Sequence, residues 1–348
     1  MVMKQIPPEK TQVKITNDHG EDHNYVFEPD AINAINAALT INRPLLVRGE
    51  PGVGKSQLAK AAAMALQRTY IPFVINASTE PQDLLWSFDA VARLADAQIE
   101  GALCQSENER AQARENLALH RYLKPAPLWA ALNWQSAEDQ YKNTHNPKDC
   151  PLPHYLNADK ASSNGVVVLI DEIDKADSSV PNGLLEVLGA NRFHPQGMDK
   201  AVEAEKNGVK PLVIITTNEE RILPDAFIRR CLSVTLGLPK GRKNQIDYLV
   251  GHAGPSFVEL SSKTLIDGSK QTLLAAVAEQ VLDDRNEADK NNLHPLPGQA
   301  EYFDLLRGLQ ARMQETSDNK IQQLIETLAR FTSKKHPDFP AKEGQKHP

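Results

Sequence analysis

The sequence predicts an α/β protein with a parallel, doubly wound sheet and a smaller C-terminal helical domain. Five short apolar stretches have the pattern of buried strands, and helix-like segments separate them along the chain. Strands that are apolar on both faces are typical of parallel sheets that helices cover on both sides. After Pro239 the apolar residues recur only at helical spacing, which predicts that the rest of the chain is helical.

A helix is expected to start at Asp30, ahead of the first strand. The first strand then leads into a glycine-rich loop and a second helix. Helices are also expected to start within Thr79–Leu85 and at Ser178, where capping residues stand ahead of apolar positions. Residues 192–210 are polar and predict either a β-hairpin or a flexible excursion. The five expected strands are Pro44–Val47, Ile71–Asn76, Gly165–Ile170, Leu212–Thr217 and Leu232–Leu236.

The length of 348 residues favours two domains. We expect an α/β domain over residues 1–240, a helical domain over 241–333 and a disordered tail over 334–348. Residues from about 95 to 164 are polar and end in a proline-rich segment, so we expect an insertion there that is partly helical around Glu107–His120. Loops of this length in compact domains are usually functional or mobile.

The composition limits the class of protein. Hydrophobic residues make up 41% of the chain and charged residues 24%, which is ordinary for a soluble globular protein. The net charge of −6 gives no global attraction to nucleic acid or to acidic membranes. Three scattered cysteines argue against a disulfide framework, and no apolar run approaches the roughly 18 residues that span a bilayer. We therefore expect a cytoplasmic protein without membrane insertion.

The glycine-rich loop GEPGVGKS, residues 49–56, has the pattern of a phosphate-binding P-loop, or Walker A motif. Its glycines let backbone N–H groups form a concave anion site, and the following helix adds the partial positive charge of its N-terminus. Lys55 would reach the β- and γ-phosphates, and Ser56 would offer its hydroxyl to Mg²⁺. An ordinary glycine-rich turn is the alternative, but every fixed position of the motif is matched here. The predicted ATP-binding residues are Gly49, Glu50, Pro51, Gly52, Val53, Gly54, Lys55, Ser56 and Gln57.

Two adjacent carboxylates follow the strand expected at Gly165–Ile170, at the end of the strand where ligands bind in open α/β sheets. Asp171 is placed to hold Mg²⁺, directly or through water. Glu172 is placed to orient and polarise an attacking water molecule. The alternative is a strand end with solvated acids, which the presence of the P-loop disfavours. The next charged residues, Asp174 and Lys175, are expected to form a local solvated ion pair.

The strand after the acidic pair ends at Asn218, which would lie beside the γ-phosphate and help to position water. Arg229 and Arg230 end a short helix directly before the last strand. A guanidinium supplied by one subunit to the γ-phosphate of a neighbour stabilises the charge that develops during transfer. The alternative is a pair of surface arginines that the helix dipole favours at a C-terminus.

This ordered set resembles the AAA+ ATPases. The segments Pro44–Ser56, Leu169–Ala176 and Ile215–Leu232 are similar to the MoxR-like subgroup, as are Tyr122–Trp129 and Leu223–Phe227. The resemblance covers about residues 25–310. It implies a sheet of strand order 5-1-4-3-2, a helical lid, and a homo-oligomeric ring, usually hexameric, with ATP and Mg²⁺ at the subunit interfaces. It also implies that Arg230 is the arginine finger, that Arg229 assists it, and that the nucleotide and hydrolysis roles fall on Lys55, Ser56, Asp171 (Walker B), Glu172 and Asn218.

Two features depart from this resemblance. AAA+ proteins commonly carry a basic "sensor 2" residue at the start of a lid helix, where this chain has Gln299. Either another lid arginine such as Arg285 or Arg307 substitutes for it, or the lid senses the γ-phosphate weakly. The insertion at about 95–164 is also longer than the subgroup leads us to expect.

The function predicted first is a ring-forming, Mg²⁺-dependent ATPase that hydrolyses ATP to ADP and phosphate and remodels or activates a partner protein. MoxR-like chaperones, which this chain resembles, often work beside a partner with a von Willebrand factor A domain. The alternative is an ATP-dependent scaffold or switch that controls an effector in trans, in a defence or regulatory system. A nucleic-acid motor is disfavoured by the net charge of −6. A small-molecule kinase is disfavoured by the Asn218 and Arg229–Arg230 elements and by the helical lid.

Overall fold

The computed structural model describes residues 4–16, 20, 22–103, 106–205, 208–264, 271–313, 320–336 and 339. The chain forms two compact units. The first holds residues 1–13, 27–48 and 56–235, and the second holds residues 14–26, 49–55 and 236–348. The predicted domain bounds at 240 and 333 stay a prediction. Most of the predicted disordered tail, residues 337, 338 and 340–348, lies outside the described residues.

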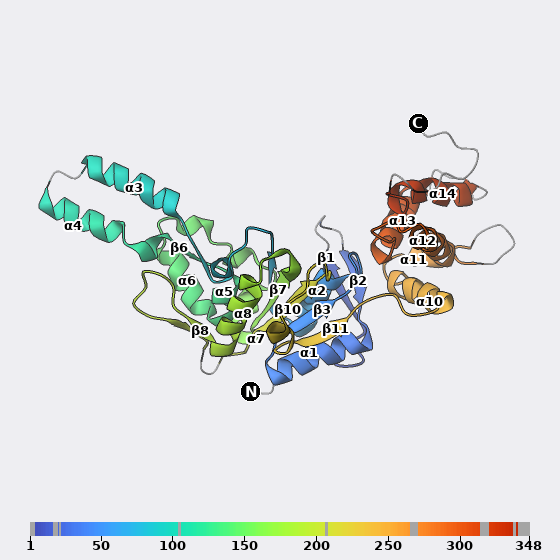
Figure 1. Cartoon of the computed structure of the whole chain (residues 1–348), viewed down its shortest axis with the longest axis horizontal. Coiled ribbons are helices and arrows are strands. Elements are labelled where there is room, and N and C mark those ends of the chain that lie inside the picture. The colour runs from blue at the N-terminus through green and yellow to red at the C-terminus, as the bar shows by residue number, and fades with distance from the viewer. Residues whose placement is uncertain are drawn as a thin grey trace. The chain divides into compact units, whose positions relative to one another are not determined.

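The first unit is built on a five-stranded parallel sheet, with helices packed on it (Figure 1). Its spatial order is β11-β3-β10-β7-β4, which is 5-1-4-3-2 when the strands are numbered along the chain, and this confirms the predicted fold class. Strands β7 and β10 are almost entirely buried, as their apolar sequences require. The strands are β3 (Leu45–Arg48), β4 (Thr69–Val74), β7 (Val166–Asp171), β10 (Leu212–Thr217) and β11 (Leu232–Thr235).

Helices join these strands and bury their apolar faces. Helix α1 starts at Pro29 and ends before Asn42, whose left-handed backbone, with φ 55°, closes the helix. It packs through Ile32, Ile35 and other apolar residues on one face. The helices of this part of the chain are α1 (Pro29–Ile41), α2 (Lys55–Leu66), α8 (Ser179–Ala190) and α9 (Asp225–Ile228).

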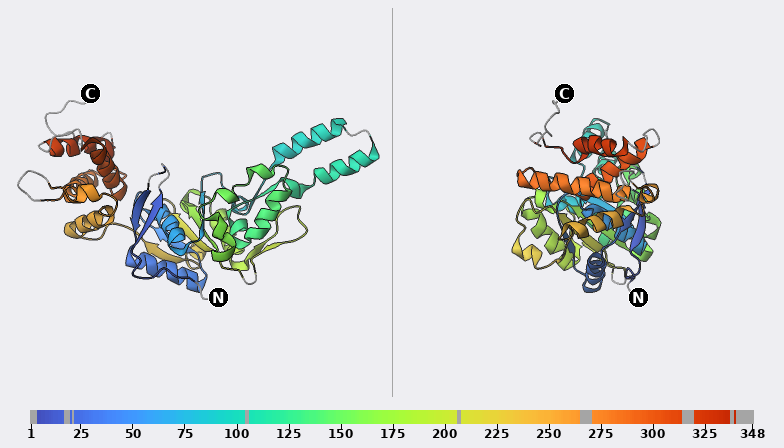
Figure 2. Two further views of the ribbon diagram at one scale, coloured as in Figure 1. Left: turned by 180° about the vertical axis from the view of Figure 1, so that it is seen from behind. Right: turned by 90° about the vertical axis from the view of Figure 1, so that its right-hand side faces the viewer.

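The long segment between β4 and β7 divides into two parts. Helices α3 (Ala90–Leu103) and α4 (Glu107–Asn116) lie side by side and extend away from the sheet (Figures 1 and 2). Helix α3 buries none of its described side chains. The second part joins the apolar core through the buried Trp129, Trp134 and Tyr141. It comprises η2 (Leu119–Tyr122), β6 (Leu123–Pro125), α5 (Pro127–Leu132), α6 (Trp134–Asn143), η3 (Pro147–Asp149), η4 (Leu152–His154), η5 (Ala158–Lys160) and α7 (Ala161–Asn164).

One expected helix is absent from the described chain. The predicted helix within Thr79–Leu85 is a single 3-10 turn, η1 (Pro81–Leu84), and the chain then continues as the strand β5 (Trp86–Phe88). The prediction was wrong because β5 pairs antiparallel with β6 and buries Trp86 against Phe193, contacts that the local sequence does not contain. Residues 192–203 form the hairpin that was one of two expected outcomes, with strands β8 (Arg192–Phe193) and β9 (Val202–Glu203).

The second unit is mainly helical, as predicted, and has its own apolar core. Tyr302 is fully buried there, and its phenol donates a hydrogen bond to the carbonyl of Leu274 at 3.1 Å. Within the described ranges, every helix of the protein is too short or too polar to cross a lipid bilayer. The helices are α10 (Arg242–Ala253), α11 (Val258–Ser261), α12 (Leu273–Lys290), α13 (Gln299–Arg312) and α14 (Ile321–Thr332). The strands β1 (Gln12–Thr16) and β2 (Asp22–Val26) form a two-stranded sheet, most of which belongs to this unit.

Candidate functional site

The glycine-rich loop has a backbone that only glycine adopts without strain. Gly49, Gly52 and Gly54 have φ values of 145°, 80° and 86°. Space is restricted as well, because a Cβ atom at Gly52 would lie 2.8 Å from the Cβ of Ala300 in the second unit. The buried Lys55 donates hydrogen bonds from Nζ to the carbonyls of Gly49 and Glu50, both at 2.8 Å. The loop therefore wraps around the lysine that the sequence assigns to phosphate.

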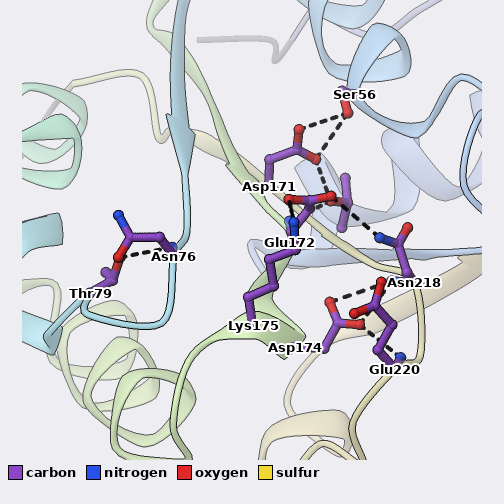
Figure 3. Close-up of polar contacts among 10 residues, drawn as sticks. Ser56, Asn76, Thr79, Asp171, Glu172, Asp174, Lys175, Asn218 and Glu220 are labelled. Atoms are coloured by element: carbon purple, nitrogen blue, oxygen red, sulfur yellow. Dashed lines mark hydrogen bonds and ion pairs between the residues drawn. The ribbon is translucent and has the colours of Figure 1, made fainter.

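In the first unit, Ser56 lies against the carboxylate of Asp171. The Ser56 hydroxyl donates toward the two oxygens of Asp171 at distances of 2.9 and 2.8 Å (Figure 3). A hydroxyl and a carboxylate are hard oxygen ligands of the kind that Mg²⁺ takes when phosphates and water supply the rest of its shell. The two residues predicted to hold the metal are therefore brought together, and their chemistry fits Mg²⁺.

A third residue, which the sequence reasoning missed, holds the two acidic residues in place through hydrogen bonds. The fully buried Thr216 on β10 donates its hydroxyl to Asp171 and accepts the backbone N–H of Glu172 at 2.9 Å. Strand β10 lies directly beside β7, with Ile215 opposite Ile170, so the Thr216 side chain reaches the acidic pair across the ladder. Its signal in the sequence was a hydroxyl residue ending an otherwise apolar strand.

Glu172 leaves strand β7 with a left-handed backbone, φ 60°, which costs a non-glycine residue about 1–2 kcal/mol. One of its carboxylate oxygens accepts a hydrogen bond from the Asn218 amide at 3.4 Å, and the other accepts from Lys175 Nζ at 2.5 Å (Figure 3). Asn218 is thus placed beside Glu172, and its predicted place beside the γ-phosphate stays a prediction. The hydrogen bond and the charge of Glu172 raise the pKa of Lys175.

The predicted ion pair between Asp174 and Lys175 is wrong. Asp174 is buried and accepts the backbone N–H groups of Asn218 and Glu220 at 3.2 and 2.9 Å (Figure 3). The left-handed turn at Glu172 carries the chain into a 3-10 turn, Ile173–Lys175, that directs Asp174 inward and Lys175 back toward Glu172. Asp174 therefore holds the loop that carries Asn218, a positioning role that the sequence did not show.

The two arginines lie at the opposite edge of the sheet from the acidic pair. Arg229 and Arg230 follow α9 directly, and the backbone N–H of Leu232 bonds the carbonyl of Pro44 at the start of β3. All five strands are parallel, so this is the edge where strands begin, whereas Glu172 lies where they end. Both arginines are exposed, and Arg230 lines a cavity of about 310 Å³ together with Arg43. Within the described part of the chain, neither arginine forms an ion pair with Asp171 or Glu172, which lie at the other end of the strands.

In the second unit, the two lid arginines that could replace a basic residue at position 299 have different partners. Arg285 on α12 donates from one nitrogen to both carboxylate oxygens of Glu50 at 2.8 Å. Arg307 instead pairs with Asp304 on its own helix at 3.1 Å. Gln299 begins α13, and its Oε1 is buried without a hydrogen-bond partner in the described part of the chain.

The fold and the site together define a P-loop protein of the AAA+ class. A family model described as "AAA domain (dynein-related subfamily)" matches residues 44–231, which is more than half of the chain, and the protein belongs to this family. Among solved structures, a RuvB mutant of Thermotoga maritima is similar, with 12% sequence identity, a TM-score of 0.42, and coverage of 87% of this chain and 68% of that chain. A search of curated proteins finds no match.

Proposed function

We propose that the protein is a ring-forming, Mg²⁺-dependent ATPase whose hydrolysis remodels or activates a partner protein. One observation carries the ring. Glu172 and Asn218 lie at one edge of the sheet and Arg230 at the other, so a single subunit cannot bring all three to one phosphate. A second copy that presents its Arg230 edge to the first would complete the set. Heterologous contacts of this kind close into a ring when the rotation from one copy to the next returns to the first, and we propose that it does so here.

The residues of this chain divide the work of hydrolysis. The loop N–H groups and Lys55 would bind the phosphates, and Ser56 with Asp171 would hold Mg²⁺, which neutralises charge on the transferring group. Glu172 would accept a hydrogen bond from the attacking water with the oxygen that faces Asn218. The water oxygen bonds to the γ-phosphorus, the bond from that phosphorus to the bridging oxygen breaks, and ADP and phosphate leave with the proton of the water.

The partner is proposed from the resemblance of the P-loop, acidic and arginine segments to MoxR-like proteins, and a protein with a von Willebrand factor A domain is the partner of choice. Glu172→Gln should bind ATP and hydrolyse it slowly, and so hold the ring on its partner. Affinity purification of this variant with ATP, followed by mass spectrometry, should yield one stoichiometric protein that is absent with ADP. Recovery of nucleic acid alone, or an identical set of proteins with ATP and ADP, would contradict the proposal.

Ring formation has a separate test. Light scattering with ATP and Mg²⁺ should show a homo-oligomer of several copies, six being the expected number. A monomer at every nucleotide concentration, with ATPase activity that does not depend on protein concentration, would overturn the ring.

A further inference from the structure

The P-loop carries an acidic residue that is already bound to a cation. Glu50 is the second residue of the loop, and its carboxylate accepts two hydrogen bonds from a single nitrogen of Arg285, both at 2.8 Å. The other terminal nitrogen of Arg285 donates to the carbonyl of Pro297 at 3.0 Å. Both residues belong to the second unit. The Arg285 side chain is 17% exposed and that of Glu50 is 54% exposed, so the guanidinium is the enclosed partner and the carboxylate the accessible one.

The helix that carries Arg285 is firmly held. The neighbouring Asp284 is 2% exposed and accepts hydrogen bonds from Gln280 at 2.9 Å, from Lys334 at 3.3 Å and from Ser333. These bonds fix this turn of α12 to the chain that follows α14. The guanidinium can therefore change its acceptor by moving its own side chain, without a shift of the helix.

The other side chains of the lid that could meet a phosphate are less suited to it. Gln299 carries no charge, so its amide N–H groups can offer a phosphate oxygen only neutral hydrogen bonds, which are weaker than those of a guanidinium. Arg307 is bound to Asp304, and Arg242 is bound to Asp283 at 2.7 Å. Among the described residues of the second unit, Arg285 contacts the phosphate-binding loop through the Glu50 carboxylate.

A carboxylate and a phosphate oxygen are equivalent acceptors for a guanidinium, and the phosphate carries more charge. A carboxylate on the P-loop also repels the triphosphate, unless a cation neutralises it. The pair therefore has two possible roles once ATP binds. Arg285 either exchanges Glu50 for a phosphate oxygen, or it stays on Glu50 and masks its charge.

We propose the exchange: without nucleotide Glu50 holds Arg285 at the P-loop, and when ATP binds a phosphate oxygen replaces the Glu50 carboxylate. The enclosed position of Arg285 and the accessible position of Glu50 favour it, since the carboxylate is the partner that can turn into solvent. Arg285 then serves as the ligand-reading residue of the lid in place of Gln299. This inference rests on the proposed ATP binding.

A double-mutant cycle separates the two roles. Binding of ATP with Mg²⁺ is measured by isothermal titration calorimetry for wild type, Glu50→Gln, Arg285→Ala and the double variant. Exchange predicts that Glu50→Gln tightens binding about three- to tenfold, because a competing carboxylate is gone. It also predicts that Arg285→Ala weakens binding about tenfold in the wild type, and about three- to tenfold more than that in the Glu50→Gln background, where no carboxylate competes for the guanidinium.

Masking predicts the opposite in the double variant. If Arg285 only neutralises Glu50, then Arg285→Ala has no cost once Glu50 is Gln, and that result would overturn the exchange. Arg307→Ala is the matched control, another lid arginine in an ion pair, and its affinity should equal that of the wild type. An equal loss in Arg307→Ala would also overturn the assignment to Arg285.

Two further measurements keep the result interpretable. Arg285→Lys keeps the charge but loses the forked guanidinium group, so its ATP affinity should lie between those of the wild type and Arg285→Ala. A folding defect of the alanine variant alone would not produce this order. Failure of the proposed function gives a different result. In that case the wild-type protein itself would show no ATP binding, or binding that the Lys55→Ala change leaves intact.

Discussion

The positions of Glu172 and Arg230 predict that two inactive variants restore each other. Register places Thr217 of β10 level with Arg48 of β3 and with Thr235 of β11, and Glu172 follows β7 at the same level. The distance along the strand from Thr235 back to Leu232, which is the strand residue nearest Arg230, is about 10 Å. Three strand spacings separate β11 from β7, which adds about 14 Å across the sheet. This separation exceeds the reach of an arginine side chain.

The perturbation is a pair of variants, Glu172→Gln and Arg230→Ala, each assayed alone and after co-expression. Loss of an arginine finger in trans typically costs about 10³-fold or more in turnover, and each variant alone should be close to inactive. In a randomly mixed ring of equal parts, an interface works when one subunit keeps Glu172 and its neighbour keeps Arg230. About a quarter of interfaces meet this condition, so the mixture should recover about a quarter of the wild-type rate.

The assay is steady-state phosphate release, with the ratio of the two chains confirmed by mass spectrometry. Arg110→Ala, which removes an exposed arginine on α4, is the matched control and should keep the wild-type rate. A mixture as inactive as its components would refute the reasoning that Arg230 acts on a neighbouring subunit. Full activity of Arg230→Ala alone would remove the finger from this residue.

Three further predictions concern single side chains. Lys55→Ala should abolish ATP binding in calorimetry while the circular dichroism spectrum stays that of the wild type, and unchanged affinity would contradict its contact with phosphate. Thr216→Val removes a buried hydroxyl that bonds the carboxylate of one acidic residue and the N–H of the next, and should lower the free energy of unfolding in urea by about 1–3 kcal/mol. A loss below about 0.5 kcal/mol would show that the hydroxyl is replaceable. Gly52→Ala should lower both Tm and ATP affinity because of the positive φ and the crowding at Ala300, whereas Gly251→Ala, in the last turn of α10 where an added Cβ would meet open space, should raise stability by about 0.5–1 kcal/mol. Equal effects of the two glycine changes would contradict the crowding argument.

The parts of the fold that the sequence predicts are those decided by local pattern. Strands β7 and β10 are buried on both faces, so their apolar residues are unbroken and the parallel sheet follows. The P-loop is recognisable because its backbone needs glycine at positions with positive φ, and that need leaves a mark in the sequence. Ser56 and Asp171 meet, as expected, because strand order places the end of β7 near the start of α2.

The parts that the sequence did not predict depend on partners far along the chain. The turn at Pro81–Leu84 has good capping residues, yet it stops after four residues because β5 pairs with β6, more than thirty residues later. Asp174 and Lys175 have adjacent opposite charges, which favours a local pair in any sequence-based reasoning. The left-handed backbone at Glu172 turns the two side chains apart. The sequence shows no sign of this backbone, since glutamate rarely adopts that conformation.

These contacts separate nucleotide binding from hydrolysis within the molecule. The P-loop, Lys55 and the Arg285–Glu50 pair lie in contacts that one chain makes by itself, so binding needs no second copy. Under the proposed function hydrolysis does need one, because Arg230 lies at the end of the sheet opposite the acidic pair. An isolated subunit should therefore bind ATP and hold it, and turnover should begin when a neighbour joins. The ATPase activity of the wild-type protein, per chain, should then rise with protein concentration. At low protein concentration, the ATP affinity of the wild type should equal that of the Arg230→Ala variant. This difference in concentration dependence is what an assembly-gated ATPase requires.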